Sequence, residues 1–158
     1  MPRVLAPIAC IASLLLIGCE RGTRDTAQSG APEWFRDITA RSGVEFTHVA
    51  ETNYFMPNQM GAGVALLDFN NDGRLDLYFV QNSWKDSSAR NQLFEQQSNG
   101  SFKNVSDGSG VDVTGRGMGS IAGDVNNDGL SDLVVTEYGA TRLFQNLTNG
   151  KFREVTSE

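Results

Sequence analysis

The sequence predicts an all-β fold built from repeated four-stranded antiparallel sheets, and three observations support this prediction. A glycine-rich stretch that begins at Gly61 recurs from Gly117, 56 residues later. Within each copy, short apolar segments alternate with clusters of Asn, Asp, Gly and Ser, which are typical turn residues. No stretch of helical periodicity competes with these segments. A repeat of this kind indicates an array of similar β units.

The first copy contains four segments that we predict to be strands, because each is short and rich in aliphatic or aromatic residues. Asn-Gly dipeptides at 99–100 and 149–150 separate the third and fourth segments and favour a two-residue hairpin turn, since both residues tolerate positive φ. Four antiparallel strands in about 50 to 60 residues, repeated, are typical of a β-propeller blade. The predicted strands are Val64 to Phe69, Leu75 to Val80, Gln92 to Gln96 and Phe102 to Ser106.

A third, partial copy precedes the two full ones. Phe35 to Thr39 match Phe102 to Ser106, and Ser42-Gly43-Val44 match Ser109-Gly110-Val111. We therefore expect a strand over Phe35 to Thr39 that resembles the fourth strand of a blade. The sequence thus predicts about two blades of an incomplete propeller, preceded by a fragment of a further repeat.

The N-terminus has the features of a targeting segment. Arg3 supplies a positive charge, and the apolar run from Ile8 to Ile17 has the length of a signal peptide rather than of a membrane-spanning helix. The run ends in Leu16-Ile17-Gly18-Cys19, which resembles the lipobox of bacterial lipoproteins. That resemblance implies cleavage before Cys19 and lipidation of its side chain. An ordinary secretory signal with an incidental cysteine is the alternative.

These patterns divide the chain into five parts. Residues 20–33 are polar and without periodicity, so we interpret them as part of a flexible tether. The predicted parts are 1–18, a lipoprotein signal peptide; 19–33, the tether; 34–60, N-terminal strands and a loop; 61–116, the first blade; and 117–158, the second blade.

Composition excludes several functions. Thirteen basic and 19 acidic residues give a formal net charge of −6 with no basic block, so the sequence predicts no nucleic-acid partner. Cys10 and Cys19 are the two cysteines, and both precede the predicted blades. His48 is the single histidine, and no serine nucleophile motif occurs, so we predict no enzymatic activity.

The loop between the first two strands of each copy carries the clearest chemical pattern. Oxygen-bearing side chains stand at positions 1, 3, 5 and 9 with glycine at position 6, and the backbone carbonyl of position 7 can add another oxygen. Hard oxygen ligands select Ca²⁺, and three carboxylates around one point would repel each other without a cation. The predicted calcium ligands are Asp68, Asn70, Asp72, Arg74 and Asp76 in the first loop, and Asp124, Asn126, Asp128, Leu130 and Asp132 in the second.

Two other interpretations of these loops are possible. An EF-hand needs flanking helices and a glutamate at position 12, but Phe79 and Val135 occupy that position and both flanks of each loop look like strands. The EF-hand interpretation therefore fails. A merely polar hairpin turn would explain one copy, but the same five positions are kept in two copies.

The pattern G-x-G-x-A-x-x-D-x-N-x-D-G-x-x-D-L from Gly61, followed by Leu-Phe and Asn-Gly-x-Phe, resembles the FG-GAP or VCBS repeat of integrin-type β-propellers. Three stretches, Phe46 to His48, Tyr54 to Pro57 and Met60 to Leu66, resemble the opening of bacterial secreted proteins of the cartilage acidic protein-like group, which often carry an ASPIC/UnbV domain. The resemblance covers about residues 34 to 158. It implies propellers of about seven blades, so we interpret the two-blade chain as truncated, with assembly from several copies as the alternative.

Two functions follow as expectations. The first is a calcium-binding, non-catalytic binding or adhesion module of the bacterial cell envelope, in the periplasm or at the outer membrane or cell surface. Its partner would be an unidentified protein or carbohydrate, and it would touch the membrane only through the lipid at Cys19. The alternative is a fragment of a larger secreted propeller enzyme whose active site lies outside this chain.

Overall fold

The computed structural model describes residues 34–49, 61–82 and 88–157. The chain divides into two compact units, Met1–Arg36 and Asp37–Glu158, and every helix and strand described here lies in the second. In the first unit, only residues 34–36 are described, and the side chains of Trp34 and Phe35 are exposed.

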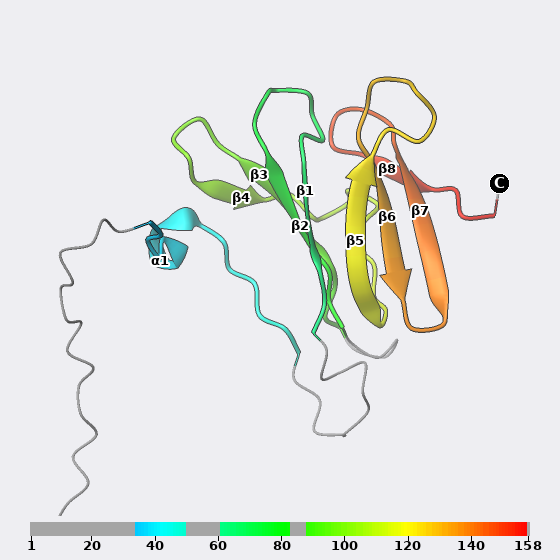
Figure 1. Cartoon of the computed structure of the whole chain (residues 1–158), viewed down its shortest axis with the longest axis horizontal. Coiled ribbons are helices and arrows are strands. Elements are labelled where there is room, and N and C mark those ends of the chain that lie inside the picture. Colours follow the sequence, from blue (N-terminus) through cyan, green and yellow to red (C-terminus); the bar gives the residue numbers. More distant parts are fainter. Residues whose placement is uncertain (1–33, 50–60, 83–87, 158) are drawn as a thin grey trace, which may run out of the picture. The chain divides into compact units, whose positions relative to one another are not determined.

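The first sheet contains β1 (Val64–Leu67), β2 (Asp76–Phe79), β3 (Gln92–Gln96) and β4 (Phe102–Asn104). Each strand pairs antiparallel with the next strand in the chain, so the order is β1-β2-β3-β4 (Figure 1). This is the up-and-down arrangement that short segments joined by tight turns predict. The predicted strands are confirmed, with ends that differ from the predicted ones by up to two residues.

The second sheet repeats this topology. It contains β5 (Gly117–Gly123), β6 (Asp132–Glu137), β7 (Ala140–Asn146) and β8 (Phe152–Glu154), in the order β5-β6-β7-β8. All three pairings are antiparallel, and the β5–β6 register shifts between Gly117 and Gly119. The described part of the protein is thus an all-β structure of two blade-like sheets, as the sequence predicts.

One hydrophobic core joins the two sheets, and β1 lies against β5. A Cβ atom built on Gly63 would lie 2.9 Å from the Cα of Gly119, so these backbones approach more closely than side chains would allow. Tyr78 lies fully buried in this core, and its hydroxyl donates a 2.8 Å hydrogen bond to the carbonyl of Val111. The buried apolar residues of the core are Ala65, Leu67, Phe69, Tyr78, Val80, Leu93, Val111, Leu133, Val135, Phe144 and Phe152.

The prediction of a strand over Phe35 to Thr39 is wrong. Residues 34–38 form no strand, and the short helix α1 covers Thr39–Ser42. The amide of Arg41 donates to the carbonyl of Ile38 at 3.0 Å, and Gly43 ends the helix with a left-handed φ of 78°. A segment forms a β-strand only when it pairs with a neighbouring strand, and none of the described strands pairs with Phe35 to Thr39.

The Ser-Gly-Val segments at 42–44 and 109–111, by contrast, have equivalent positions in the structure. Gly43 and Gly110 both have positive φ, of 78° and 87°. A Cβ on Gly43 would collide with the carbonyl oxygen of Phe102, and one on Gly110 would collide with that of Phe152. Each Ser-Gly-Val segment therefore lies against the fourth strand of a sheet.

The Asn-Gly hairpins are one residue longer than predicted. The amide of Gln97 donates to the carbonyl of Ser101 at 2.7 Å, and the amide of Leu147 donates to that of Lys151 at 2.8 Å, so three residues lie in each loop. Gly100 and Gly150 hold the left-handed conformation at its end, with φ of 81° and 69°. In the first hairpin this is the geometry of the three-residue loop that needs glycine at that position, whereas in the second hairpin Thr148 and Asn149 also have positive φ, of 75° and 51°.

Candidate metal centre

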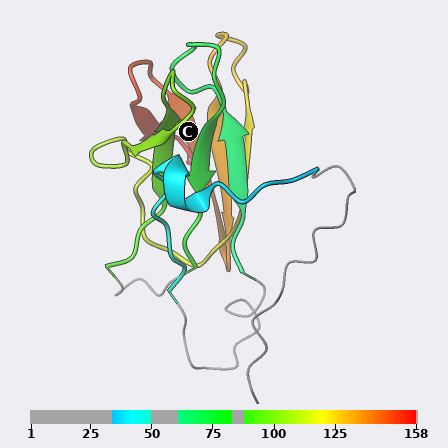
Figure 2. The same cartoon turned by 90° about the vertical axis from the view of Figure 1, so that its left-hand side faces the viewer.

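The two predicted calcium loops occupy the same place in their sheets. The first runs from Asp68 to Leu75 between β1 and β2, and the second runs from Asp124 to Ser131 between β5 and β6. Both loops lie at the same end of the sheets (Figures 1 and 2). The side-chain amide of Asn71 donates to the carbonyl of Gly129 at 3.4 Å, which links the two loops directly.

The backbone turns in the same way in both loops. Asn71 and Asn127 have φ of 58° and 60°, and Gly73 and Gly129 have φ of 82° and 84°. A Cβ on either glycine would meet no atom within 4 Å, so position 6 needs glycine for its conformation rather than for space. The sharp turn that the sequence predicts at this position is confirmed.

Side chains 1, 3 and 5 of the first loop point inward onto the amides of the turn. The carboxylate of Asp68 accepts hydrogen bonds from the amides of Asp72 at 3.0 Å and Gly73 at 2.8 Å. Asn70 also accepts from the amide of Asp72, at 3.2 Å, and Asp72 accepts from the amide of Arg74 at 2.9 Å. Three oxygen-bearing side chains therefore surround one short stretch of backbone.

The second loop repeats this network. Asp124 accepts from the amides of Asp128 at 3.1 Å and Gly129 at 2.8 Å. Asn126 and Asp128 accept from the amides two residues further on, at 3.0 and 2.9 Å. The backbone hydrogen bonds, that from Gly129 first, hold the pKa of Asp124 below its ordinary value. The loop thus favours the charged form of its first carboxylate.

Position 9 has a structural role that sequence reasoning missed. Asp76 is fully buried, and its two oxygens accept from the amides of Phe69 at 3.2 Å and Gln96 at 2.7 Å. This carboxylate therefore fastens the base of the loop to β3. Burial raises the pKa of Asp76, and the negative charges of Asp72 and Asp68 raise it further. Asp68, Asp72 and Asp76 are therefore close enough for their negative charges to repel one another.

Asp132 has the same role in the second sheet. It is buried and accepts from the amides of Val125 at 3.1 Å and Asn146 at 2.7 Å. The side-chain amide of Asn146 in turn donates to the carbonyl of Phe69 at 2.9 Å and to that of Ser131 at 3.1 Å. Asn146 therefore bridges the bases of the two loops, a contact 77 residues apart in sequence that no local pattern reveals.

Position 7 distinguishes the two loops. The guanidinium of Arg74 forms an ion pair with Asp72 and donates to the carbonyl of Gln96 at 2.9 Å. Leu130 holds the equivalent place in the second loop and brings no charge. There the second oxygen of Asp128 accepts a 2.7 Å hydrogen bond from the neutral amide of Asn126. The first loop therefore contains a cation of its own, and the second does not.

The donor chemistry of both loops fits Ca²⁺, because all their candidate ligands are oxygens and carboxylates predominate. Within the described residues, however, no group of three or more His, Cys, Asp or Glu side chains converges closely enough to hold a metal ion. The inward carboxylate oxygens are instead engaged with backbone amides of the turn. A bound cation would have to draw on their remaining lone pairs, together with Asn70 or Asn126 and backbone carbonyls.

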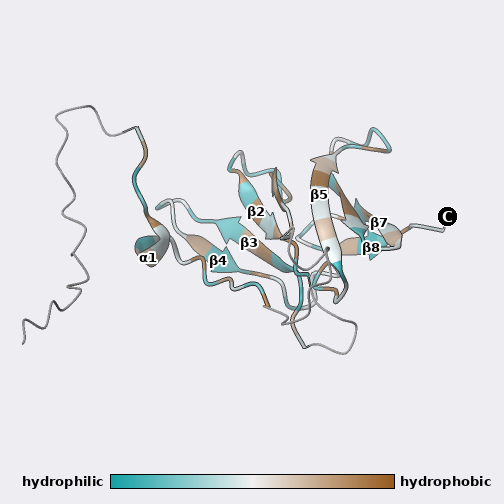
Figure 3. Ribbon diagram, turned by 60° about the horizontal axis from the view of Figure 1, so that its bottom comes forward, coloured by the Kyte–Doolittle hydropathy of each residue, from teal (hydrophilic) through white to brown (hydrophobic). Residues whose placement is uncertain are grey.

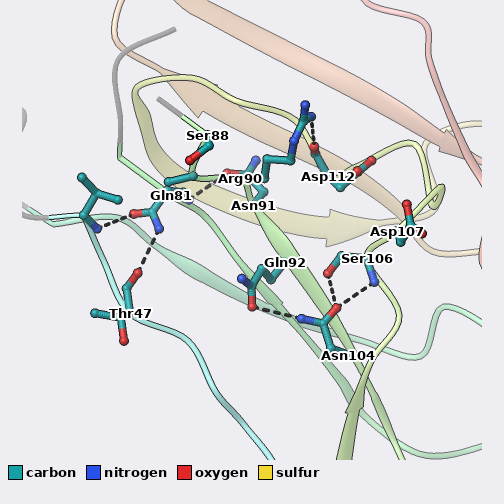
Figure 4. A pocket seen from close by; sticks show the side chains of 12 residues that line it. Thr47, Gln81, Ser88, Arg90, Asn91, Gln92, Asn104, Ser106, Asp107 and Asp112 are labelled. Carbon is teal, nitrogen blue, oxygen red and sulfur yellow. Dashed lines mark hydrogen bonds between the residues drawn. The ribbon is translucent and has the colours of Figure 1, made fainter. Parts of the chain in front are cut away.

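The structure also contains a polar cavity of about 470 Å³ beside β3 and β4 (Figure 4). Its side chains bond mainly to one another and to nearby backbone. Gln81 accepts from the amide of Val49 and donates to the carbonyl of Thr47, both at 3.0 Å. Asn104 donates to Gln92 at 3.2 Å and accepts from Ser106. These contacts fasten neighbouring segments to the first sheet.

Cys19 and the predicted signal peptide and tether, residues 1–33, lie outside the described residues. Among the residues that are described, no helix is long and apolar enough to cross a membrane.

A four-stranded sheet with a D-x-N-x-D-G-x-x-D loop between its first two strands defines a propeller-type repeat. The family model described as FG-GAP-like repeat matches residues 68–135, a stretch that includes both loops. The chain is similar to cartilage acidic protein 1, at 26% identity over 112 residues for the protein of Homo sapiens and 25% over 112 residues for that of Xenopus tropicalis. These matches cover 68% of this chain and 17% of each relative, so the chain spans about a sixth of their length.

Proposed function

We propose that the chain is a calcium-binding, non-catalytic binding or adhesion module. The observation that carries the proposal is the repetition of one network in two loops. In each, the side chains at positions 1, 3 and 5 surround the same turn amides, and a buried aspartate at position 9 anchors the loop to the neighbouring strand. A polar turn needs only one or two such side chains, whereas a calcium loop needs the whole set.

The proposal extends to the setting of the module. The lipobox-like sequence before Cys19 supports an extracytoplasmic module held at a bacterial envelope membrane by a lipid. The ligand class we propose is a protein or a carbohydrate, since the net charge of −6 disfavours nucleic acid. Because the chain covers a small part of its relatives, the alternative of a fragment of a larger secreted propeller enzyme stays a prediction.

Calorimetric titration of the full chain with Ca²⁺ tests the metal part of the proposal. We expect two sites with dissociation constants of about 10⁻⁴ to 10⁻³ M, the range of extracellular modules, and weaker binding of Mg²⁺. Asp72→Ala should remove one site and Asp128→Ala the other. Full binding by the double variant, or no binding by the unaltered chain, would refute the assignment.

A further inference from the structure

The side chain at position 3 of each loop, Asn70 or Asn126, is an amide, and only one of its two ends can bind a cation. Its oxygen is an acceptor, whereas its nitrogen carries two donor hydrogens and has no lone pair to offer a metal ion. A loop that binds Ca²⁺ through this residue must therefore keep the oxygen turned toward the amides of the turn. The partner of the nitrogen decides how firmly that orientation is held.

In the first loop, the nitrogen of Asn70 is held from outside the loop. It donates to the Oε1 atom of Glu95 at 3.2 Å, while the oxygen of Asn70 accepts from the amide of Asp72 at 3.2 Å. An ionised carboxylate only accepts hydrogen bonds and a backbone amide only donates them, so a flipped Asn70 would lose both bonds. Asn70 and Glu95 are both half-buried, which strengthens these bonds against exchange with water.

Glu95 reaches the loop from β3, which is a separate element of the first sheet. It lies next to last in that strand, at the hydrophilic end of β3 (Figure 3). Lys103 lies opposite Glu95 in the β3–β4 register, but among the described residues the carboxylate of Glu95 bonds to Asn70 instead. Glu95 and Asn70 also line the same cavity, of about 440 Å³. The carboxylate of Glu95 is therefore directed at the calcium loop.

The second loop holds its position-3 amide differently. Gln145 stands at the position of Glu95, and its oxygen accepts from Arg153, its partner in the β7–β8 register, at 3.0 Å. The nitrogen of Asn126 donates to the Oδ2 atom of Asp128 at 2.7 Å, so it occupies an oxygen of another candidate ligand. The two loops thus share one set of candidate ligands but differ in what orients the amide.

We propose that Glu95 is a positioning residue of the first calcium site, which keeps the oxygen of Asn70 turned toward the cation and its nitrogen turned away. This inference rests on the proposed calcium function and adds a residue that lies outside the loop pattern. Partners that orient a metal ligand without touching the metal are typically worth about tenfold to a hundredfold in affinity. Asn70 is a neutral ligand, so we expect an effect of about tenfold, the lower end of that range.

Calorimetric titration of the full chain carrying Asp128→Ala, in which we expect only the first site to remain, tests this proposal. Glu95→Ala should raise the Ca²⁺ dissociation constant about tenfold. Glu95→Gln should keep most of the affinity, because its amide oxygen still accepts from Asn70 although the charge is gone. Gln145→Ala is the matched control, since it truncates the equivalent residue of the second sheet and should leave the first site unchanged.

Nuclear magnetic resonance of the metal-free chain gives a second readout, which does not depend on calcium binding. The side-chain amide signals of Asn70 should shift in Glu95→Ala, while the backbone amide of Gly73, which donates to Asp68, should stay in place. A shift of Gly73 as large as that of Asn70 would show a merely structural role and overturn the proposal.

The two proposals fail in different ways. Absence of Ca²⁺ binding by the unaltered chain would overturn the proposed function and this role with it. Normal Ca²⁺ binding by Glu95→Ala would overturn the positioning role alone. An equal loss of affinity in Glu95→Gln and Glu95→Ala would also overturn it, because the charge of Glu95 rather than the orientation of Asn70 would then be responsible.

Discussion

Gly63 and Gly119 lie back to back where β1 meets β5, so close that a Cβ on Gly63 would lie 2.9 Å from the Cα of Gly119. The two residues occupy equivalent positions of the repeat. The approach lets the buried faces of the two sheets meet in one core. It also brings the two candidate calcium loops together at one end of the sheets (Figure 1).

Gly63→Ala should therefore destabilise the protein. The added methyl group would meet backbone atoms of Gly119 and Ser120, which cannot turn away, so we expect a loss of about 1–3 kcal/mol in the free energy of unfolding. Urea unfolding followed by circular dichroism measures this loss. Gly123→Ala is the control, because a Cβ on Gly123 meets nothing within 4 Å. An equal loss in both variants would show that the close approach does not hold the sheets together.

Local sequence pattern predicted most of the fold. Strands such as Leu75 to Val80 were predictable because their apolar residues follow one another between turn residues, and the repeat supplied each pattern twice. The segment Phe35 to Thr39 shows the limit of this reasoning. Its sequence matches β4, but it pairs with none of the described strands, and Thr39–Ser42 forms a helical turn instead. A strand depends on its neighbour as much as on its own residues.

The loop conformation could also be predicted from the sequence, because Gly73 and Gly129 indicate the turn and the side chains before them indicate which positions point inward. Two features of the loops could not be predicted. Asp76 and Asp132 fasten the loops to the third strand of each sheet, and Asn146 joins the first loop to the second. These contacts connect residues far apart in the chain, so no spacing rule contains them.

The ion pair between Arg74 and Asp72 predicts that the two loops bind Ca²⁺ with different affinities. Arg74→Leu makes the first loop resemble the second and removes a positive charge that opposes a cation. The pair is partly exposed, so we expect a gain of about 1 kcal/mol, or roughly fivefold in the dissociation constant of that site. Calorimetric titration measures the change, and Leu130→Arg should produce the reverse effect in the second loop.

Arg90→Leu is the control for this prediction, because it removes the same charge from a residue that bonds to the carbonyl of Asp112 instead. If Arg90→Leu and Arg74→Leu changed the affinity equally, net charge rather than the ion pair would be responsible.

Tyr78 predicts a loss of stability at alkaline pH. Burial raises the pKa of its hydroxyl well above the ordinary value of about 10. The folded state therefore keeps a proton that the unfolded state loses, so stability falls as the pH rises above the pKa of the hydroxyl in the unfolded chain.

Absorbance at 295 nm should show one tyrosine that ionises only on unfolding. Tyr78→Phe should flatten the alkaline dependence but lower stability at neutral pH by about 1–3 kcal/mol, because Asn91 and Val111 lose a buried partner. An early titration of all tyrosines would contradict this account.

Cys19 predicts a lipid anchor. In a bacterial host, the full chain should incorporate labelled palmitate and partition into the detergent phase, since acyl chains contribute roughly 0.8 kcal/mol per buried CH₂ group. Cys19→Ala should abolish both properties, and Cys10→Ala should leave them unchanged. Labelling that persists in Cys19→Ala would exclude this residue as the lipid attachment site.

Thermal unfolding of the full chain with Ca²⁺ and with a chelator tests the central claim most directly. Binding to the native state alone stabilises by about 2.7 kcal/mol per site at a hundredfold excess over the dissociation constant. We predict that chelation lowers the melting temperature by several degrees, that added Ca²⁺ restores it, and that the variant carrying both Asp72→Ala and Asp128→Ala responds to neither. An unaltered chain that is shown to be free of metal and yet melts at the same temperature with and without Ca²⁺ would contradict the account and make both loops ordinary polar turns.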